Sequence, residues 1–181
     1  MITLDVEYTP EESRKEKTRI VQFNQFVGGR QTGKTRLLVN RVVDAAIRNE
    51  NILVWASSRN QTEMLKDCIN FELSKYEGTE VSGSFLSNDF IISDVSDYCE
   101  CCSRGETKVS KITFSNRENR YMHPDTVYSF IAIDNVEMLA SDVMTAEENL
   151  FSGLRSTKRT PDCRIFVTSA RPLNISSELY I

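Results

Sequence analysis

The chain has 181 residues, of which 40% are hydrophobic, and it carries a net charge of −4 at pH 7. These values predict a globular domain with its own core, and the acidic balance excludes a protein that binds nucleic acid through overall positive charge. No apolar run approaches the ~20 residues of a membrane-spanning helix, so no membrane partner is expected. No secretion signal opens the sequence, and we expect a cytoplasmic protein with reduced cysteines.

The first part of the chain contains a glycine-rich loop between a predicted strand and a predicted helix. Residues 1–19 are mostly polar and form a charged N-terminal lead-in. Residues 20–27 are strand-like, and residues 37–47 have helical spacing. Between them, residues 28–35 read GGRQTGKT and match the pattern G-x-x-x-x-G-K-[ST]. A strand, this loop and then a helix form the setting in which the pattern binds phosphate.

The residue types of this loop suit a nucleotide. Glycines let the backbone turn tightly and direct its N–H groups at phosphate oxygens. Lys34 is expected to reach the β- and γ-phosphates, and the Thr35 hydroxyl is expected to bind Mg²⁺. The expected nucleotide-binding residues of the loop are Gly28, Gly29, Gln31, Thr32, Gly33, Lys34 and Thr35.

Strand and helix patterns alternate along the rest of the chain. Residues 51–57 are typical of a buried parallel strand, and helical spacing resumes over 64–73. Residues 77–107 predict loops around a short strand near 89–92, and 108–114 alternates polar and apolar residues as an edge strand does. The remaining predicted elements are a strand over 127–133, a helix over 142–157 and a strand over 164–169.

This alternation predicts an α/β fold with a mostly parallel sheet. The sequence contains no internal repeat, no low-complexity segment and no mark of a second domain. Residues 20–181 are therefore predicted to form a single domain.

Asp134 closes the apolar strand predicted over 127–133. Ligands of open α/β sheets bind at the carboxyl ends of the strands, and in P-loop enzymes such an aspartate holds Mg²⁺ beside the position of Thr35. The next residue, Asn135, stands where many ATPases have a water-activating glutamate, and an amide has no basic lone pair at neutral pH. Glu137 either replaces that glutamate at the γ-phosphate or merely starts the next helix. The sequence leaves both interpretations open.

Three further residues are candidates for responding to the γ-phosphate. Thr168 and Ser169 end the last predicted strand, where polar side chains can sense the phosphate and pass its state to the next element. Arg30 lies inside the loop and is a candidate arginine finger, because a fixed guanidinium stabilises the charge of the transition state.

Three of the five cysteines, Cys99, Cys101 and Cys102, lie close together, and His123 is the only histidine. Structural zinc sites usually take their ligands as C-x₂₋₄-C pairs, and no second pair is present. We therefore expect free thiols rather than a zinc site.

Residues 30–35, RQTGKT, resemble the Walker A motif of the ATPase domain of large terminases. These proteins are the DNA-packaging motors of tailed bacteriophages and herpesviruses. Residues 51–58 are similar to the second strand of that domain, residues 164–172 are similar to its coupling motif, and Asp134 stands at Walker B. The resemblance is specific at the loop and extends over residues 20–175.

The resemblance implies a three-layer P-loop NTPase fold whose mostly parallel sheet is of the additional-strand, RecA-like type. It implies ATP and Mg²⁺ as cofactors and double-stranded DNA as a partner. A homo-oligomeric ring, a portal or nuclease partner, and action in the cytoplasm of a host are implied as well. In the family, Arg30 corresponds to the cis arginine finger, Asp134 to the Mg²⁺ carboxylate, and Thr168 and Ser169 to the coupling residues. DNA cleavage is not expected, because the sequence stops where the nuclease domain of the family would begin.

Three hypotheses of function stay open. The first is an ATPase that couples ATP binding and hydrolysis to translocation of double-stranded DNA. The second is a non-hydrolysing ATP-binding module with a regulatory or assembly role, which Asn135 favours. The third is a small-molecule kinase, for which residues 155–159, RSTKR, are the candidate for an arginine-bearing lid.

Overall fold

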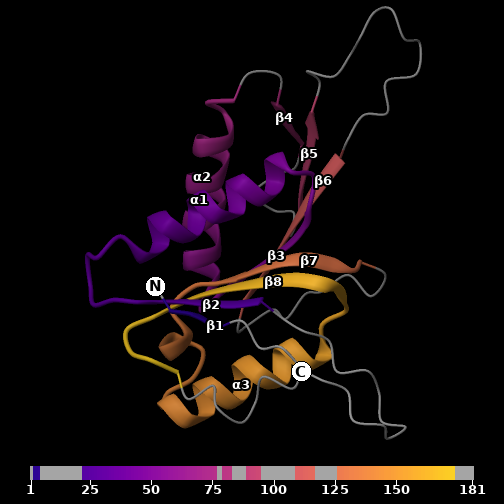
Figure 1. The fold of residues 1–181 in the computed structure, drawn as a ribbon. Helices are drawn as coiled ribbons and strands as arrows, with labels where there is room; N and C mark the ends of the chain where they lie inside the picture. The colour runs from indigo at the N-terminus through magenta and orange to yellow at the C-terminus, as the bar shows by residue number, and fades with distance from the viewer. Residues whose placement is uncertain are drawn as a thin grey trace, which may run out of the picture.

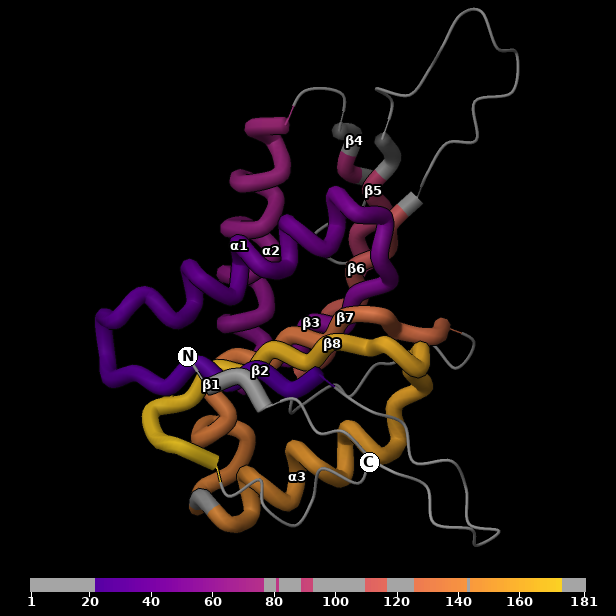
Figure 2. The backbone as a smooth tube through the Cα atoms, in the orientation of Figure 1, coloured from indigo at the N-terminus to yellow at the C-terminus, as the bar shows by residue number. Residues whose placement is uncertain are grey.

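The structure is a computed structural model that describes residues 2–4, 22–76, 79–82, 89–94, 109–116 and 126–173. The described strands form one twisted eight-stranded sheet with the order β1-β2-β8-β7-β3-β6-β5-β4 (Figures 1 and 2). The strands are β1 (Ile2–Leu4), β2 (Gln22–Val27), β3 (Asn51–Ala56), β4 (Thr79–Ser82), β5 (Asp89–Asp94), β6 (Val109–Asn116), β7 (Tyr128–Ile133) and β8 (Arg159–Ser169).

Helices cover both faces of the sheet, which gives three layers. The helices α1 (Lys34–Ile47) and α2 (Arg59–Leu73) lie on one face, and α3 (Val143–Ser156) lies on the other (Figure 1). A short 3₁₀ helix, η1 (Val136–Met138), connects β7 to α3. Ser58 and Asp142 cap α2 and α3 by accepting hydrogen bonds from the backbone N–H groups three residues further on.

The five central strands β2, β8, β7, β3 and β6 are mutually parallel. The strand that carries the glycine-rich loop, β2, is separated by β8 from β7, the strand that ends before Asp134. This intervening strand is the additional strand of the RecA-like type, so the predicted fold class is confirmed.

Two hydrophobic clusters fill the spaces between the layers. Successive residues of β3 alternate between them: Ile52 and Val54 pack toward α1 and α2, whereas Leu53 and Trp55 pack toward α3. Helix α3 approaches the sheet closely, since a Cβ built on Gly153 would lie 2.2 Å from the Trp55 ring. Both faces of β3 are thus buried, in agreement with its continuous apolar sequence.

The structure corrects the sequence predictions at the β6 end of the sheet. The strand predicted over 108–114 is β6, but it is an interior strand rather than an edge. The edge of β6 that was expected to be unpaired is hydrogen-bonded to β5. Strand β5 pairs in turn with β4, which was not predicted from the sequence. The polar residues of β6 look solvent-exposed in the sequence, but Ser110 and Thr113 are fully buried.

Two other elements extend further than the sequence predicts. Strand β8 begins at Arg159 rather than at residue 164. Within the expected lead-in, Ile2–Leu4 pair with β2 as an antiparallel strand, and the rest of that segment lies outside the described residues.

The predictions of free thiols and of no membrane-spanning helix can be compared with the structure only within the described residues. Cys99, Cys101, Cys102 and His123 all lie outside the described residues. Within the described parts of the chain, no helix has the length and apolar character needed to span a membrane.

Candidate functional site

The glycine-rich loop joins the end of β2 to the start of α1 with a strained, compact backbone. The Gly28 N–H donates to the Ser169 carbonyl at 3.0 Å, which ties the loop to the end of β8. Gly33 has φ +81° and Gln31 has φ +60°, both in the left-handed region that most side chains avoid. A Cβ on Gly28 would lie 2.5 Å from the Thr32 hydroxyl oxygen, so this position needs glycine.

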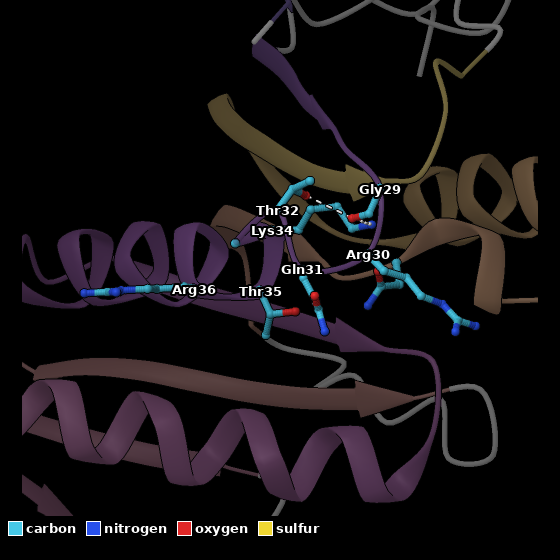
Figure 3. A pocket seen from close by; sticks show the side chains of 9 residues that line it. Gly29, Arg30, Gln31, Thr32, Lys34, Thr35 and Arg36 are labelled. Atoms are coloured by element: carbon cyan, nitrogen blue, oxygen red, sulfur yellow. Dashed lines mark hydrogen bonds between the residues drawn. The ribbon is translucent and has the colours of Figure 1, made fainter.

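The loop encloses a cavity of about 360 Å³ at the N-terminus of α1. Residues 29–36 and Asn135 line it. The Lys34 ammonium donates to the carbonyls of Gly28 (2.6 Å) and Gly29 (3.2 Å), and Figure 3 shows Thr32 and Lys34 turned back toward Gly29. Unpaired N–H groups at a helix start, a helix dipole and three basic side chains favour an anion in this cavity.

Asp134 follows β7 and is fully buried. Its Oδ1 accepts a hydrogen bond from the Thr168 hydroxyl at 2.7 Å, and its Oδ2 accepts one from the Thr35 hydroxyl at 3.2 Å. The carboxylate therefore connects the end of β8 to the first turn of α1. Thr35 stands between it and the cavity, so the hydroxyl and the carboxylate present adjacent hard oxygen atoms of the kind that Mg²⁺ prefers.

Two amide side chains complete the surroundings of the Asp134 carboxylate. Asn135 Nδ2 donates to Oδ2 at 3.0 Å, and the Asn135 backbone N–H donates to the Thr168 hydroxyl at 2.9 Å. Asn135 has φ +51°, a left-handed conformation that asparagine tolerates better than most residues. Gln61, in the first turn of α2, also donates from Nε2 to Asp134 Oδ2.

The segment that follows β8 is fastened to the sheet by a second group of hydrogen bonds. The buried Gln25 of β2 donates to the Ser169 hydroxyl at 2.6 Å and to the Arg171 carbonyl at 3.0 Å, and it accepts from the Leu173 N–H at 3.3 Å. Glu137 accepts from the Ala170 N–H at 3.1 Å. The two residues that the sequence assigns to coupling, Thr168 and Ser169, thus contact different partners: Thr168 the carboxylate, Ser169 the glutamine.

The structure brings most of the predicted site residues together, with two exceptions. The loop, Asp134 and Thr168 adjoin one another at the carboxyl ends of the strands. The Arg30 side chain lines the cavity but points away from Lys34 and Thr35 (Figure 3). The Glu137 carboxylate contacts the Ala170 N–H instead of lining the cavity, which favours a structural link over a role at the γ-phosphate in this conformation.

The proposed kinase lid lies at the wrong end of the sheet. Residues 155–159 form the end of α3 and the start of β8, and the Tyr128 N–H at the start of β7 donates to the Lys158 carbonyl at 3.0 Å. In a parallel sheet this edge is opposite to the one that holds the loop. The lid interpretation is wrong.

Sequence reasoning missed the roles of Gln25 and Gln61. Gln25 is buried in β2, but this strand also contains the polar residues Gln22 and Asn24, so the sequence alone does not single it out. Gln61 comes a few residues after the carboxyl end of β3, where parallel strands direct residues toward a shared site. The described residues hold no group of three or more His, Cys, Asp or Glu side chains that could bind a metal by themselves.

Comparisons with known proteins give matches of structure only. No protein-family model matches the chain, and no curated protein matches it by sequence. The large terminase ATPase domain of Thermus phage P74-26 aligns with a TM-score of 0.53 at 16% identity, over 92% of this chain and 67% of that one. The HK97 bacteriophage large terminase aligns with a TM-score of 0.58 at 13% identity, over 87% of this chain and 31% of that one.

A third solved structure carries a nucleotide. It is the large terminase of another thermophilic bacteriophage in complex with ATP-γ-S, and it aligns with a TM-score of 0.55 at 10% identity, over 82% of this chain and 32% of that one. The chain thus spans about a third of the length of this terminase and of the HK97 terminase. At these identities the likeness concerns the backbone. The chain has the fold of large-terminase ATPase domains.

Proposed function

We propose that the chain binds ATP with Mg²⁺ at the glycine-rich loop. The observation that carries this proposal is the Thr35 hydroxyl 3.2 Å from the buried Asp134 carboxylate, directly beside a cavity of about 360 Å³ lined by the loop. The similar terminase structure that contains ATP-γ-S supports a nucleotide as the ligand.

The loop residues provide the phosphate contacts. The Lys34 ammonium, which now donates to the Gly28 and Gly29 carbonyls, exchanges these neutral acceptors for phosphate oxygens, which form stronger charge-assisted hydrogen bonds. The residues that line the cavity include the first turn of α1, whose backbone N–H groups would stabilise the anion. The remaining loop side chains, Gln31 and Thr32, shape the wall of the cavity.

Thr35 and Asp134 are the residues that would hold Mg²⁺. When bound, this ion would supply positive charge that neutralises the phosphates. The protein's own part is to keep the two oxygen atoms together, and the hydrogen bonds of Thr168 and Asn135 to the carboxylate do this. The hydrogen-bond partners of the Asp134 carboxylate described above are all neutral.

Arg30 and Glu137 have different prospects in hydrolysis. Arg30 is exposed at the rim of the cavity, and a rotation of its side chain brings the guanidinium to the phosphates as an arginine finger. Glu137 must first release the Ala170 N–H to act on water. We therefore assign to Arg30 the stabilisation of the negative charge that develops in the transition state. In this conformation Glu137 links η1 to the segment after β8.

Coupling is proposed to run through the ends of β7 and β8. Thr168 is hydrogen-bonded to Asp134, and Ser169 is hydrogen-bonded to Gln25 and to the carbonyl of Arg171. A change at the carboxylate therefore reaches the segment after β8 through two adjacent residues. These contacts support a protein in which the state of the bound nucleotide moves the segment after β8.

We extend the proposal to a motor that translocates double-stranded DNA during viral genome packaging. The shared fold of large-terminase ATPase domains supports it. A homo-oligomeric ring, a portal or nuclease partner supplied by other chains, and action in the host cytoplasm belong to the same proposal.

The second candidate is an ATP-binding module that does not hydrolyse. It is favoured by Asn135, whose amide lies at the cavity and donates to Asp134 where a water-activating carboxylate would be expected. Single-turnover measurements with purified protein distinguish the two candidates. Phosphate release supports the motor, and tight ATP binding without release supports the module.

The test of the whole proposal is ATP turnover with and without double-stranded DNA, beside the variant Lys34→Ala. We expect turnover that DNA stimulates and that Lys34→Ala abolishes. Turnover that survives Lys34→Ala would mean that the chemistry occurs elsewhere. Turnover that DNA leaves unchanged would contradict the translocation part alone.

A further inference from the structure

We infer that Gln61 is a positioning residue that orients the Asp134 carboxylate for the metal ion. The inference rests on the proposed function of the site and deepens it. Gln61 belongs to α2, an element with no part in the loop or in the Asp134 strand, so its contact with the carboxylate adds α2 to α1, β7 and β8 at the site.

The orientation of the Gln61 amide is fixed by its neighbours. Its Oε1 accepts a hydrogen bond from the Ser57 backbone N–H at 3.2 Å and another from the Ser57 hydroxyl. A backbone N–H can only donate, so the amide oxygen must face Ser57. The Nε2 group therefore faces Asp134, where it donates to Oδ2. The amide links the end of β3 to the end of β7.

The carboxylate is held by donors from separate elements. Thr168, at the end of β8, donates to Oδ1 at 2.7 Å, while Gln61 donates to Oδ2 from α2. A donor on each oxygen fixes the rotation of the carboxylate plane. Both donors are neutral, so they hold the group without cancelling the negative charge that a cation needs.

The Thr35 hydroxyl contacts both the carboxylate and the expected position of the metal ion. It donates to Oδ2, and its two lone pairs stay available to a cation. Oδ2 also accepts from Gln61 and Asn135. Without Gln61, the donors left on this oxygen are Thr35, itself a candidate metal ligand, and the amide of the adjacent residue, which moves with the same backbone.

The test measures how much Mg²⁺ strengthens nucleotide binding. Calorimetry gives the Kd of ATP-γ-S in excess Mg²⁺ and in EDTA, and the ratio of the two is the coupling between metal and nucleotide. Residues that orient metal ligands typically change metal affinity by 10–100-fold when mutated. We expect Gln61→Leu, which keeps the bulk and loses the amide, to reduce the ratio roughly tenfold while the Kd in EDTA stays the same.

Ser58→Ala is the matched control. Ser58 caps α2 by accepting from the Gln61 backbone N–H at 3.3 Å, so its loss loosens the same helix turn without touching Asp134. It should lower the melting temperature by roughly 2–4 °C and leave the Mg²⁺ ratio unchanged. Ser57→Ala, which removes only one of the two donors to Gln61, should reduce the ratio by a smaller factor and serves if Gln61→Leu does not fold.

The outcomes separate this inference from the proposed function. If the unmodified protein binds no ATP-γ-S, the proposed function fails and the inference fails with it. If binding is Mg²⁺-dependent and neither Gln61→Leu nor Ser57→Ala changes the ratio, the inference alone is overturned. Equal weakening in EDTA and in Mg²⁺ would also overturn it, because that result describes a general loss of structure.

Discussion

The two ends of the parallel strands carry polar residues that are organised in different ways. At the carboxyl ends, Thr35, Gln61, Asn135 and Thr168 all direct hydrogen bonds to one buried carboxylate, Asp134. At the amino ends, contacts are pairwise. Arg164 forms an ion pair with Glu50 and lies over the Phe130 ring, with 5.2 Å between the guanidinium carbon and the ring centroid.

The difference separates function from support in physical terms. The four donors to Asp134 are neutral, so they leave its negative charge uncancelled next to a cavity. Burying such a charge costs free energy unless a cation binds beside it. The ion pair of Arg164 and Glu50 at the amino ends cancels its own charges. We therefore expect variants at the carboxyl ends to change ligand binding and variants at the amino ends to change stability alone.

The largest effect is expected from Lys34→Ala. Hydrogen bonds to charged groups contribute about 1.5–3 kcal/mol each, so the loss of this ammonium should weaken ATP-γ-S binding by about two orders of magnitude. Lys158→Ala, an exposed lysine at the amino ends of the strands, is the control and should leave the Kd unchanged. Calorimetry measures both. Equal effects of the two variants would show that overall charge, not the loop, governs binding.

A second contrast uses two of the buried threonines, Thr168 and Thr157. Thr168 donates to the Asp134 carboxylate at 2.7 Å, whereas Thr157 donates to the Gly153 carbonyl at 2.8 Å. Thr168→Val removes a bond to a buried charge and should destabilise the protein by about 2 kcal/mol, against about 1 kcal/mol for Thr157→Val. Chemical denaturation gives both values. Only Thr168→Val should also weaken Mg²⁺-dependent nucleotide binding; a reversed order would contradict the contrast.

The sequence was a good guide to elements with strong local patterns. The strand, loop and helix around residues 28–35 were predicted correctly, as was the strand that ends before Asp134. Their conformations are set by nearby residues: glycine at a position with φ +81°, apolar runs for buried strands. The additional-strand type of the mostly parallel sheet followed from the resemblance at the loop and was confirmed.

The sequence was a poor guide to features that depend on residues far apart along the chain. Strand β6 was predicted to be an edge because nothing in its own residues reveals the β4–β5 hairpin that covers it. Gln25 and Gln61 look like ordinary polar residues, and their importance depends on partners more than 70 positions away along the chain. Glu137 was left between two roles, and its contact with the Ala170 N–H favours the structural one.

Asn135→Glu tests whether the carboxyl-end site lacks only a base. A positioned general base contributes at least about a hundredfold to a proton transfer, but glutamate tolerates the left-handed backbone at φ +51° less well than asparagine. We therefore expect a net increase of roughly tenfold in the single-turnover rate of ATP hydrolysis. Asn135→Gln, of the same length but without a basic group, is the control and should give no increase. A gain with glutamine as well would assign the effect to side-chain length.

The smallest effect is expected from Arg164→Met at the amino ends of the strands. Methionine keeps much of the side-chain volume but loses both the ion pair with Glu50 and the cation–π contact with Phe130. Both contacts are partly exposed, and screening by water limits their combined contribution to about 1 kcal/mol. Denaturation should report this loss, while the Kd for ATP-γ-S stays unchanged.

Arg48→Met is the matched control for this last variant, because the Arg48 side chain is exposed and donates to the Asp44 backbone carbonyl, at 3.1 Å, rather than to a carboxylate. It should change the free energy of unfolding by no more than about 0.5 kcal/mol. If Arg164→Met weakened ATP-γ-S binding, strain at the amino ends would have to reach the loop through β8, the strand in which Arg164 pairs with the first residue of β2 and Thr168 lies near the end. The two ends of the sheet would then act as one unit, and the separation of support from binding would not hold.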